Sequence, residues 1–376
     1  MKNVTIHPAD AGRRLDRFLQ KILPAADRGF LYKMLRKKNI TLNGKKADGP
    51  EVLCAGDTVT FFFSDETFAR FRGEEGATPD EAPAALKPGA AASPSAGRTG
   101  APGIRAGRKD PQDAAGVWPA SLTVVYEDER IVAVNKPAGM LSQKSAPEDV
   151  SLCEYLAARF AETGSLTFRA GVANRLDRNT SGLVLAGKTL EGQQFLAECF
   201  RKRTLRKYYR TLVFGQVSAP REIAHVLTKD EAHNRVRLSG TGRPEGPAGG
   251  RQRPDAEEDG EVRIRLWAEE SFPGCTLLKV QLLTGKSHQI RAQLAAEGFP
   301  VAGDPKYGDP RKNEALSERL GLPLRHQLLH AEEIFFNDGN GAYSGKSIRA
   351  PLPAHFERCL ALLRRQKEGQ GGKYGF

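Results

Sequence analysis

The sequence predicts an α+β protein with a mainly antiparallel mixed sheet in a large domain and a small α/β domain before it. Short apolar strands follow one another at hairpin-like spacing instead of alternating regularly with helices. Near the N-terminus, apolar residues recur at helical spacing. Two stretches with few apolar residues separate or interrupt these patterns. A chain of 376 residues is long enough for two or three domains.

The first predicted domain covers residues 1–63. Its apolar residues form two groups at helical spacing, Leu15, Phe18 and Leu19, then Phe30, Leu31, Met34 and Leu35. A strand over 40–42 leads into Asn43-Gly44, a pair that readily adopts positive φ in a tight turn. Twelve Lys or Arg and six acids give this domain a net charge of +6, half of the +12 of the whole chain.

Low apolar content predicts three segments without stable structure. Residues 64–119 and 240–260 are rich in Ala, Gly, Pro and charged residues, and they bury too little apolar surface to offset the entropy of ordering. We therefore predict a disordered linker at 64–119, a surface insertion at 240–260 and a flexible tail at 366–376.

The second predicted domain covers residues 120–365. Apolar runs bounded by turn residues predict strands at 122–125, 131–134, 183–186, 209–214, 262–266 and 276–283. Ser151 and Glu154 form a capping-box pattern that predicts the start of a helix. Further helices are predicted at 189–200 and from His288 to near Gly298, a suitable C-terminal cap.

Composition limits the classes of function. The net charge of +12 favours a polyanionic partner. The five cysteines are widely spaced without a Cys-x-x-Cys pair, so we expect reduced thiols and neither a disulfide framework nor a zinc site. The N-terminus has no apolar signal core and no run approaches the ~18 apolar residues of a membrane span, so we expect a cytoplasmic protein.

The segment NRLDRNTSGL, residues 174–183, carries the strongest indication of chemistry. It places Asp177 between Arg175 and Arg178, where nearby positive charge favours an ionised carboxylate. Such a group can act as a nucleophile or a base. The alternative for an arbitrary Arg-Leu-Asp is a solvated salt bridge. Arg14-Leu15-Asp16 repeats the tripeptide without Thr-Ser-Gly, and we interpret it as a helix start without a catalytic role.

This segment resembles the central catalytic motif of the RluA-type RNA pseudouridine synthases, His-Arg-Leu-Asp-x-x-Thr-Ser-Gly-Leu. Asn174 replaces the histidine, which keeps a hydrogen-bonding group but removes the option of a protonated, charged one. Further resemblances follow in the family's order, at Asn135–Gly139, Lys207–Val213, Leu283–Arg291, Gly303–Gly308 and Leu329–Ala331. The N-terminal domain resembles the alpha-L RNA-binding domain carried by the RluC-like branch.

The resemblance implies that Asp177 is the catalytic carboxylate, that Tyr209 stacks on the flipped base, and that Arg291 pairs with Asp177. The residues that it predicts to bind RNA or substrate are Lys33, Arg36, Lys37, Lys136, Asn174, Arg175, Thr180, Lys286, His288 and Gln289. The basic cluster Arg201, Lys202, Arg203, Arg206 and Lys207 is open to two interpretations, a solvated helix end or an RNA-facing edge. We expect the segments 303–308 and 329–331 to support the cleft, with His330 as a structural histidine.

The implied activity is site-specific isomerisation of uridine to pseudouridine in RNA, with large-subunit ribosomal RNA as the expected substrate. The implied enzyme is a monomer that needs no cofactor and no metal. A non-catalytic RNA-binding or ribosome-assembly factor that retains the fold is the alternative. A glycosidase that uses two carboxylates is disfavoured because no matching motif supplies a second acid.

Overall fold

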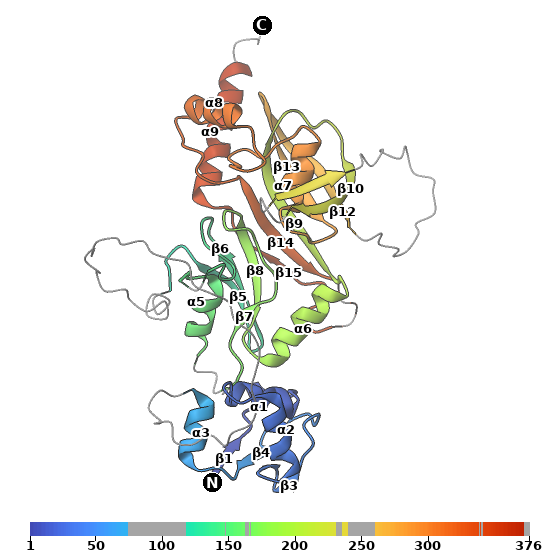
Figure 1. The fold of residues 1–376 in the computed structure, drawn as a ribbon. Helices are drawn as coiled ribbons and strands as arrows, with labels where there is room; N and C mark the ends of the chain where they lie inside the picture. Colours follow the sequence, from blue (N-terminus) through green and yellow to red (C-terminus); the bar gives the residue numbers. More distant parts are fainter. Residues whose placement is uncertain are drawn as a thin grey trace, which may run out of the picture. The chain divides into compact units, whose positions relative to one another are not determined.

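The computed structural model describes residues 1–73, 118–230, 235–239 and 260–371, apart from gaps at 147, 162–164, 166, 338 and 340. Figure 1 shows its helices and strands. Contacts divide the chain into two units, Met1–Ala114 with Glu162–Phe168, and Ala115–Ala161 with Arg169–Phe376. Each unit has a hydrophobic core of its own.

The first unit combines helices with a four-stranded sheet of order β1-β4-β2-β3. Its elements are β1 (Lys2–Thr5), η1 (Pro8–Asp10), α1 (Leu15–Ile22), α2 (Arg28–Arg36), β2 (Ile40–Leu42), β3 (Lys45–Lys46), β4 (Thr58–Phe61) and α3 (Asp65–Arg72). The predicted turn joins β2 to β3, with φ of 51° at Asn43 and 71° at Gly44. Positive φ at both positions matches the turn that suits a two-residue hairpin.

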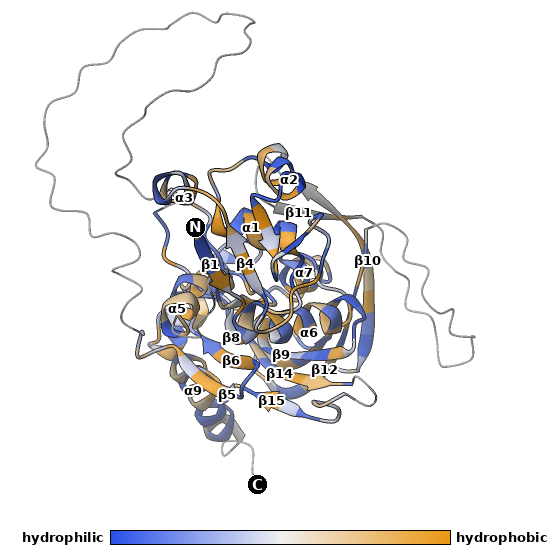
Figure 2. Cartoon of the chain, turned by 90° about the horizontal axis from the view of Figure 1, so that it is seen from below, coloured by the Kyte–Doolittle hydropathy of each residue, from blue (hydrophilic) through white to orange (hydrophobic). Residues whose placement is uncertain are grey.

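Amphipathic sequence explains the two predicted helices of this unit. In α1 the predicted residues Leu15, Phe18 and Leu19 are fully buried. In α2, Asp27 caps the first turn by accepting a hydrogen bond from the backbone of Phe30 at 2.8 Å. Both helices carry apolar and polar residues in Figure 2, and the predicted apolar faces are confirmed.

The predicted domain boundaries are wrong in three places. The helix α3 occupies the predicted start of the linker, because Ser64 caps it and Phe68 packs edge-on against Phe61 at 5.1 Å between ring centroids. The segment 162–168 belongs with the first unit, where Thr167 hydrogen-bonds to Asp10 and Arg13. At the C-terminus, α9 (Ala354–Gly371) continues into the predicted tail, because helix formers follow its apolar residues.

The second unit is built on an eleven-stranded sheet. Its elements before α9 are β5 (Thr123–Glu127), β6 (Ile131–Lys136), α5 (Leu152–Arg159), β7 (Gly171–Val172), β8 (Ser181–Gly187), α6 (Leu190–Arg201), β9 (Leu205–Phe214), β10 (Arg221–Asp230), β11 (Arg235–Ser239), β12 (Glu261–Phe272), β13 (Cys275–Leu282), α7 (Gln289–Ala296), α8 (Pro310–Leu320), β14 (Leu329–Phe336) and β15 (Ser347–Arg349). The order is β11-β10-β12-β13-β9-β14-β8-β6-β5, with β15 beside β14 and β7 beside β8. Among these named strands, only β14 and β8 pair in parallel, so the predicted mainly antiparallel, mixed sheet is confirmed.

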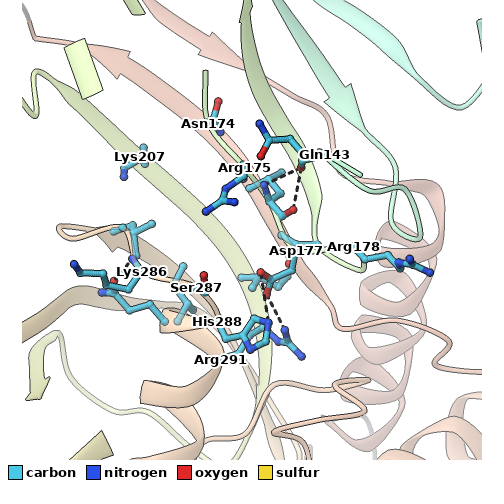
Figure 3. A pocket seen from close by; sticks show the side chains of 18 of the residues that line it. Gln143, Asn174, Arg175, Asp177, Arg178, Lys207, Lys286, Ser287, His288 and Arg291 are labelled. Atoms are coloured by element: carbon cyan, nitrogen blue, oxygen red, sulfur yellow. Dashed lines mark hydrogen bonds and ion pairs between the residues drawn. The ribbon is translucent and has the colours of Figure 1, made fainter. Parts of the chain in front are cut away.

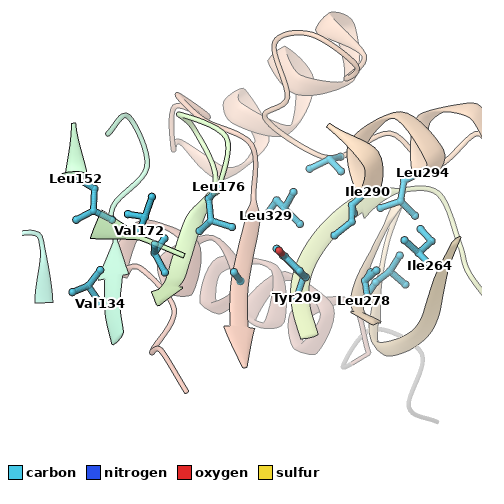
Figure 4. Packing of buried hydrophobic residues seen from close by; sticks show 14 of the residues in the cluster. Val134, Leu152, Val172, Leu176, Tyr209, Ile264, Leu278, Ile290, Leu294 and Leu329 are labelled. Atoms are coloured by element: carbon cyan, nitrogen blue, oxygen red, sulfur yellow. The ribbon is translucent and has the colours of Figure 1, made fainter. Parts of the chain in front are cut away.

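Helices cover both faces of this sheet. Successive residues of β6 and β8 enter different cores, with Val134 and Val184 on the face of α5 and α7, and Ala133 and Leu185 on the face of α6. Burial on both faces explains why these strands are continuous apolar runs. Figure 4 shows the first core, where Tyr209 of β9 lies among apolar residues of the sheet and Ile290 of α7.

The sequence patterns located the central strands but missed other elements. The pair β10 and β11, the strands β14 and β15, and the helices α8 and α9 have no counterpart among the predictions. Of the predicted insertion at 240–260, all but Gly260 lies outside the described residues. None of the described helices is long and apolar enough to cross a membrane.

Candidate active site

A cleft of about 550 Å³ opens in the second unit. It lies where the loop before β8 meets β9 and the start of α7, as Figure 3 shows. Its lining includes six Lys or Arg residues but a single acid, Asp177. The cations are Lys144, Arg175, Arg178, Lys207, Lys286 and Arg291. This charge pattern suits a polyanionic ligand with one carboxylate placed to act on it.

Backbone contacts hold the loop that carries Asp177. The carbonyl of Asp177 accepts a hydrogen bond from the backbone N–H of Thr180 at 3.0 Å, which closes the turn. Ser142 fixes the preceding residue, because its hydroxyl donates to the carbonyl of Leu176 at 2.9 Å and accepts from that residue's N–H at 3.0 Å. The carboxylate therefore projects into the cleft from a fixed main chain.

The Thr-Ser-Gly sequence after Asp177 has a structural purpose. The hydroxyl of Ser181 lies 2.9 Å from Nδ1 of His330 on β14. Since Nε2 of His330 must donate to the carbonyl of Ala350, Nδ1 accepts from Ser181. Gly182 has a φ of 115°, and a Cβ there would lie 2.2 Å from the carbonyl oxygen of Ala331. Only glycine lets β8 approach β14 this closely.

His330 is a structural residue, as predicted. Its side chain is fully buried. Burial lowers the pKa of His330 to about 4, although its hydrogen bond to Ala350 opposes that shift. The ring is therefore neutral at physiological pH and serves to join β8 to the chain after β15.

Arg291 links Asp177 to a second carboxylate. Its Nη1 donates to Oδ2 of Asp177 at 2.7 Å. Its Nε and Nη2 donate to the two carboxylate oxygens of Asp304, at 2.7 and 2.8 Å. Asp304 is 1% exposed and Arg291 is 5% exposed, whereas the Asp177 side chain is 25% exposed. Asp304 therefore anchors the guanidinium from behind while Asp177 remains open to the cleft.

Asp304 is held ionised despite its burial. Desolvation would raise its pKa, but the hydrogen bonds and charge of Arg291 and the backbone N–H groups of Lys306 and Tyr307 outweigh burial. The pKa of Asp304 consequently lies below its usual value. This residue was absent from the predicted site residues, although the segment 303–308 was expected to support the cleft.

His288 and Tyr307 complete this side of the cleft. His288 Nε2 lies 4.0 Å from Oδ1 of Asp177, and its Nδ1 lies 3.0 Å from the hydroxyl of Tyr307. Desolvation lowers the pKa of His288, while the charge of Asp177 opposes the shift. The guanidinium of Arg291 also lies 5.2 Å from the centroid of the Tyr307 ring. The sequence prediction of His288 at the site is consistent with this position.

Tyr209 reaches the cleft from β9. Its side chain is 7% exposed and packs in the core that lies between the sheet and α7. Burial, followed by the charge of Asp177, raises the pKa of its hydroxyl. The hydroxyl therefore keeps its proton at neutral pH, so Tyr209 can offer a ring face and a hydrogen-bond donor.

The cation that contacts Asp177 is not one of its sequence neighbours. Arg178 points away from Asp177 in Figure 3, and its guanidinium lies 4.0 Å from a carboxylate oxygen of Asp149. Arg175 is exposed at the lining of the cleft. The flanking arginines therefore supply nearby charge only, and the contact is made by Arg291, as the family resemblance implied, from a helix more than a hundred residues further along the chain.

Four residues that we predicted to bind RNA make hydrogen bonds within the protein. Asn174 bonds to the backbone of Leu183 and Leu185. Thr180 is buried and accepts from Gln327. The Gln289 amide is 2% exposed and makes four hydrogen bonds, to Thr284, Lys286, Arg263 and Gln293. Asn174, Thr180 and Gln289 also line the cleft, so their roles in binding RNA stay predictions. Lys136 is fully buried and does not line the cleft, so its binding prediction is wrong.

Lys136 joins two loops of the site. It is fully buried, and its ammonium group donates to the carbonyls of Pro137, Met140 and Arg178 at 2.8 to 3.1 Å. Burial lowers the pKa of Lys136 to about 7, although the charge of Asp177 opposes that shift. Three carbonyl acceptors match the three donors of the protonated form. The lysine thus fastens the loop after β6 to the loop that carries Asp177.

Replacing Lys136 with methionine should lower the free energy of unfolding by about 2–3 kcal/mol, because buried carbonyls lose their donor. Urea unfolding followed by circular dichroism measures this change. Lys286→Met is the matched control, since Lys286 is exposed, and its unfolding midpoint should stay unchanged. Equal midpoints for the two variants would contradict the proposed fastening of the loops.

The second Arg-Leu-Asp has a different setting. Asp16 is 4% exposed and accepts from Arg14 at 2.9 Å, from the backbone of Arg17 at 2.8 Å and from the Tyr32 hydroxyl at 2.9 Å. Its carboxylate therefore joins α1 to α2 inside the first unit. The interpretation as a helix start is confirmed by α1, which begins at Leu15.

Asp16→Ala should cost the first unit about 1–3 kcal/mol of stability, because several donors lose their acceptor. The rate of uridine conversion at saturating RNA should change less than twofold. Thermal unfolding and single-turnover kinetics measure the two quantities. A hundredfold slower rate in the folded variant would mean that Asp16, and not only Asp177, takes part in the chemistry.

The remaining predicted binding residues are exposed. Lys286 lies at the lining of the cleft, and Lys33, Arg36 and Lys37 lie on or directly after α2. The basic cluster after α6 divides into two parts. Arg201 and Lys202 pair with Glu198, as expected of a solvated helix end. The described residues contain no group of three or more His, Cys, Asp or Glu that could hold a metal ion.

Known proteins resemble this chain over almost its whole length. A relative from Vibrio vulnificus, named ribosomal large subunit pseudouridine synthase C, is 26% identical over 94% of this chain and 94% of its own. A protein of the same name from Escherichia coli K12 is 28% identical over 97% of each chain. The family model described as RNA pseudouridylate synthase matches residues 130–296, the segment that supplies Asp177, Tyr209 and Arg291.

The chain therefore resembles the RNA pseudouridylate synthase family in the segment that forms the cleft. The RluA-type, RluC-like assignment made from the motifs is confirmed, because relatives of that name match the N-terminal unit as well as the cleft. These matches support the activity of an RNA pseudouridine synthase. Among solved structures, human RNA pseudouridylate synthase domain containing 4 gives a TM-score of 0.48 at 19% identity, covering 64% of this chain and 92% of that one.

Proposed function

We propose that this chain isomerises uridine to pseudouridine in large-subunit ribosomal RNA, with Asp177 as its catalytic carboxylate. The reaction breaks the bond between ribose and N1 of uracil, turns the base and rejoins it through C5. The observation that carries the proposal is the single carboxylate in a cleft lined by six Lys or Arg residues. The names of the two relatives supply the substrate class.

The site residues have separable roles in this proposal. Asp177, with one face open to the cleft, acts on the ribose or the base of a uridine that has been flipped out of its stack. Arg291 holds the carboxylate in place through its bond of 2.7 Å. Tyr209 offers its ring to the flipped base, and its hydroxyl, which keeps its proton because its pKa is raised, can donate a hydrogen bond.

The geometry disfavours the alternatives. Hydrolysis by a glycosidase requires a second carboxyl group at the scissile bond. Asp304 cannot serve, because it is buried behind Arg291. Of the departures from the family motifs, Asn174 and Gln293 bond to backbone carbonyls, away from the contact between Asp177 and Arg291. No observation therefore favours a non-catalytic RNA-binding factor.

Tritium release tests the proposal with the purified full-length chain. Isomerisation replaces the hydrogen at C5 of uridine, so RNA labelled with tritium at C5 should release label into water. Large-subunit ribosomal RNA transcribed without modification is the substrate, and small-subunit RNA of the same label is the control. Release from neither RNA would refute the proposed activity, and equal release from both would refute the proposed substrate.

Exposed cations of the first unit are proposed to add affinity without adding chemistry. Changing Lys33, Arg36 and Lys37 together to glutamine should weaken RNA binding and reduce the slope of log affinity against log salt by up to about 2, because each phosphate contact to single-stranded RNA contributes roughly 0.7. The turnover rate at saturating RNA should not change. Filter binding at several salt concentrations measures the slope, and an unchanged slope would refute this role.

We also propose that the chain acts in the cytoplasm as a monomer, where ribosomal RNA is accessible to it. Sedimentation at the concentration used for the kinetics measures the oligomeric state.

A further inference from the structure

A second, smaller hollow of about 210 Å³ adjoins the cleft. The two share part of their lining, namely Phe200, Lys207 and Leu282. Figure 3 shows Lys207 at the edge of the cleft, on the same side as Lys286 and away from Asp177. A ligand in the smaller hollow therefore lies next to a ligand in the cleft.

The charge of this hollow has one sign. Arg203, Arg206 and Lys207 line it, and no acid does. All three belong to the basic cluster after α6, whose other members, Arg201 and Lys202, pair with Glu198. Arg203 has a φ of 55° where the chain turns from α6 towards β9. The turn thus divides one run of cations between a solvated helix end and the wall of a hollow.

Lys207 is the member that most needs an anion. Its side chain is half-buried, and among the described residues no carboxylate lies within ion-pair distance of its ammonium. The ammonium instead lies 6.0 Å from the centroid of the Phe200 ring. Burial, followed by the charge of Arg203, lowers the pKa of Lys207 to about 8. Withdrawing a cation from water in this way is unfavourable unless an anion compensates it.

We propose that the smaller hollow binds the phosphodiester of a nucleotide adjacent to the target uridine, through Lys207 and Arg206. The inference rests on the proposed function, because it assumes a flipped uridine in the cleft. The shared wall brings the hollow within reach of the RNA backbone on one side of that nucleotide. Binding there fixes where the backbone leaves the cleft, and it adds a contact that carries no base information.

The test compares two lysines of the same cluster. Lys207→Met and Lys202→Met remove the same charge, but only Lys207 lines the hollow. Binding of unmodified large-subunit ribosomal RNA is measured at several salt concentrations, with Asp177→Asn also present so that the RNA is not converted. Lys207→Met should weaken binding about tenfold and reduce the salt slope by about 0.7 to 0.9, and Arg206→Met should act in the same direction.

Lys202→Met should leave both affinity and slope unchanged. Equal losses for the Lys202 and Lys207 variants would overturn the proposal, because the cluster would then act as a diffuse field. An unchanged slope in Lys207→Met would overturn it as well. Methionine suits a half-buried position, and Lys207→Arg should restore binding in the same assay. Because binding is measured without turnover, these outcomes are independent of whether tritium is released.

Discussion

Asp177→Asn should abolish tritium release from uridine labelled at C5, with a loss of at least about 1,000-fold in rate. The amide has nearly the shape of the carboxylate, but it supplies neither a nucleophilic oxygen nor a base. Single-turnover kinetics at saturating RNA measures the effect. Asp16→Asn is the matched control, because it makes the same change in the other Arg-Leu-Asp.

Folding should tolerate the change at Asp177. The side chain is one-quarter exposed, and its partner Arg291 keeps both bonds to Asp304. We expect the free energy of unfolding to fall by less than about 1 kcal/mol, as for a partly exposed ion pair. Turnover by the folded variant at more than one-tenth of the normal rate would mean that another group performs the chemistry.

Arg291→Met should destroy both activity and much of the stability. It leaves the Asp304 carboxylate buried without its cation, and breaking a buried pair in this way costs about 3–5 kcal/mol. Chemical unfolding and tritium release measure the two losses. Stability should recover in the double variant Arg291→Met with Asp304→Asn, whereas activity should not. Recovery of activity along with stability would show that Arg291 only maintains the fold.

The cost of Arg291→Met should also depend on pH. In the normal protein the pKa of Asp304 is depressed, so its pairing contributes stability above the usual pKa of an aspartate, and this contribution is lost as pH falls through the lowered value. Without Arg291, burial raises that pKa instead. The difference in unfolding free energy between the two proteins should therefore be largest near neutral pH and should shrink below about pH 4. If the difference in unfolding free energy stayed constant between about pH 3 and 7, Asp304 would not be a buried, ionised carboxylate.

The sequence predicted the strands, helices and turns that leave a local sequence pattern. The continuous apolar runs of β6 and β8, the capping box before α5 and the Asn43-Gly44 turn are local features, so they were predicted correctly. Helix α3 was missed because only Phe68 in it is fully buried, and one aromatic residue produces no period. Two signals of this helix were available in the sequence. Ser64 caps its N-terminus, and Gly73, with φ of 76°, follows its last residue.

The contacts within the site could be predicted only in part from the sequence. The contact between Asp177 and Arg291 came from the family resemblance, since residues so distant in sequence have no local pattern that pairs them. Lys136 and Gln289 were assigned to RNA because polar side chains in a motif resemble ligands. Only the folded chain shows that their partners are backbone carbonyls and another amide. The same limit explains Asp304, whose partner lies on α7.

Pseudouridine mapping in ribosomal RNA from cells that lack this protein tests the central claim most directly. The cells carry either no copy, the normal chain or the Asp177→Asn chain at equal abundance. We predict that at least one pseudouridine of the large-subunit RNA disappears without the protein, returns with the normal chain and stays absent with Asp177→Asn. An unchanged map in the cells without the protein, or a map restored by Asp177→Asn, would contradict the assignment of this cleft.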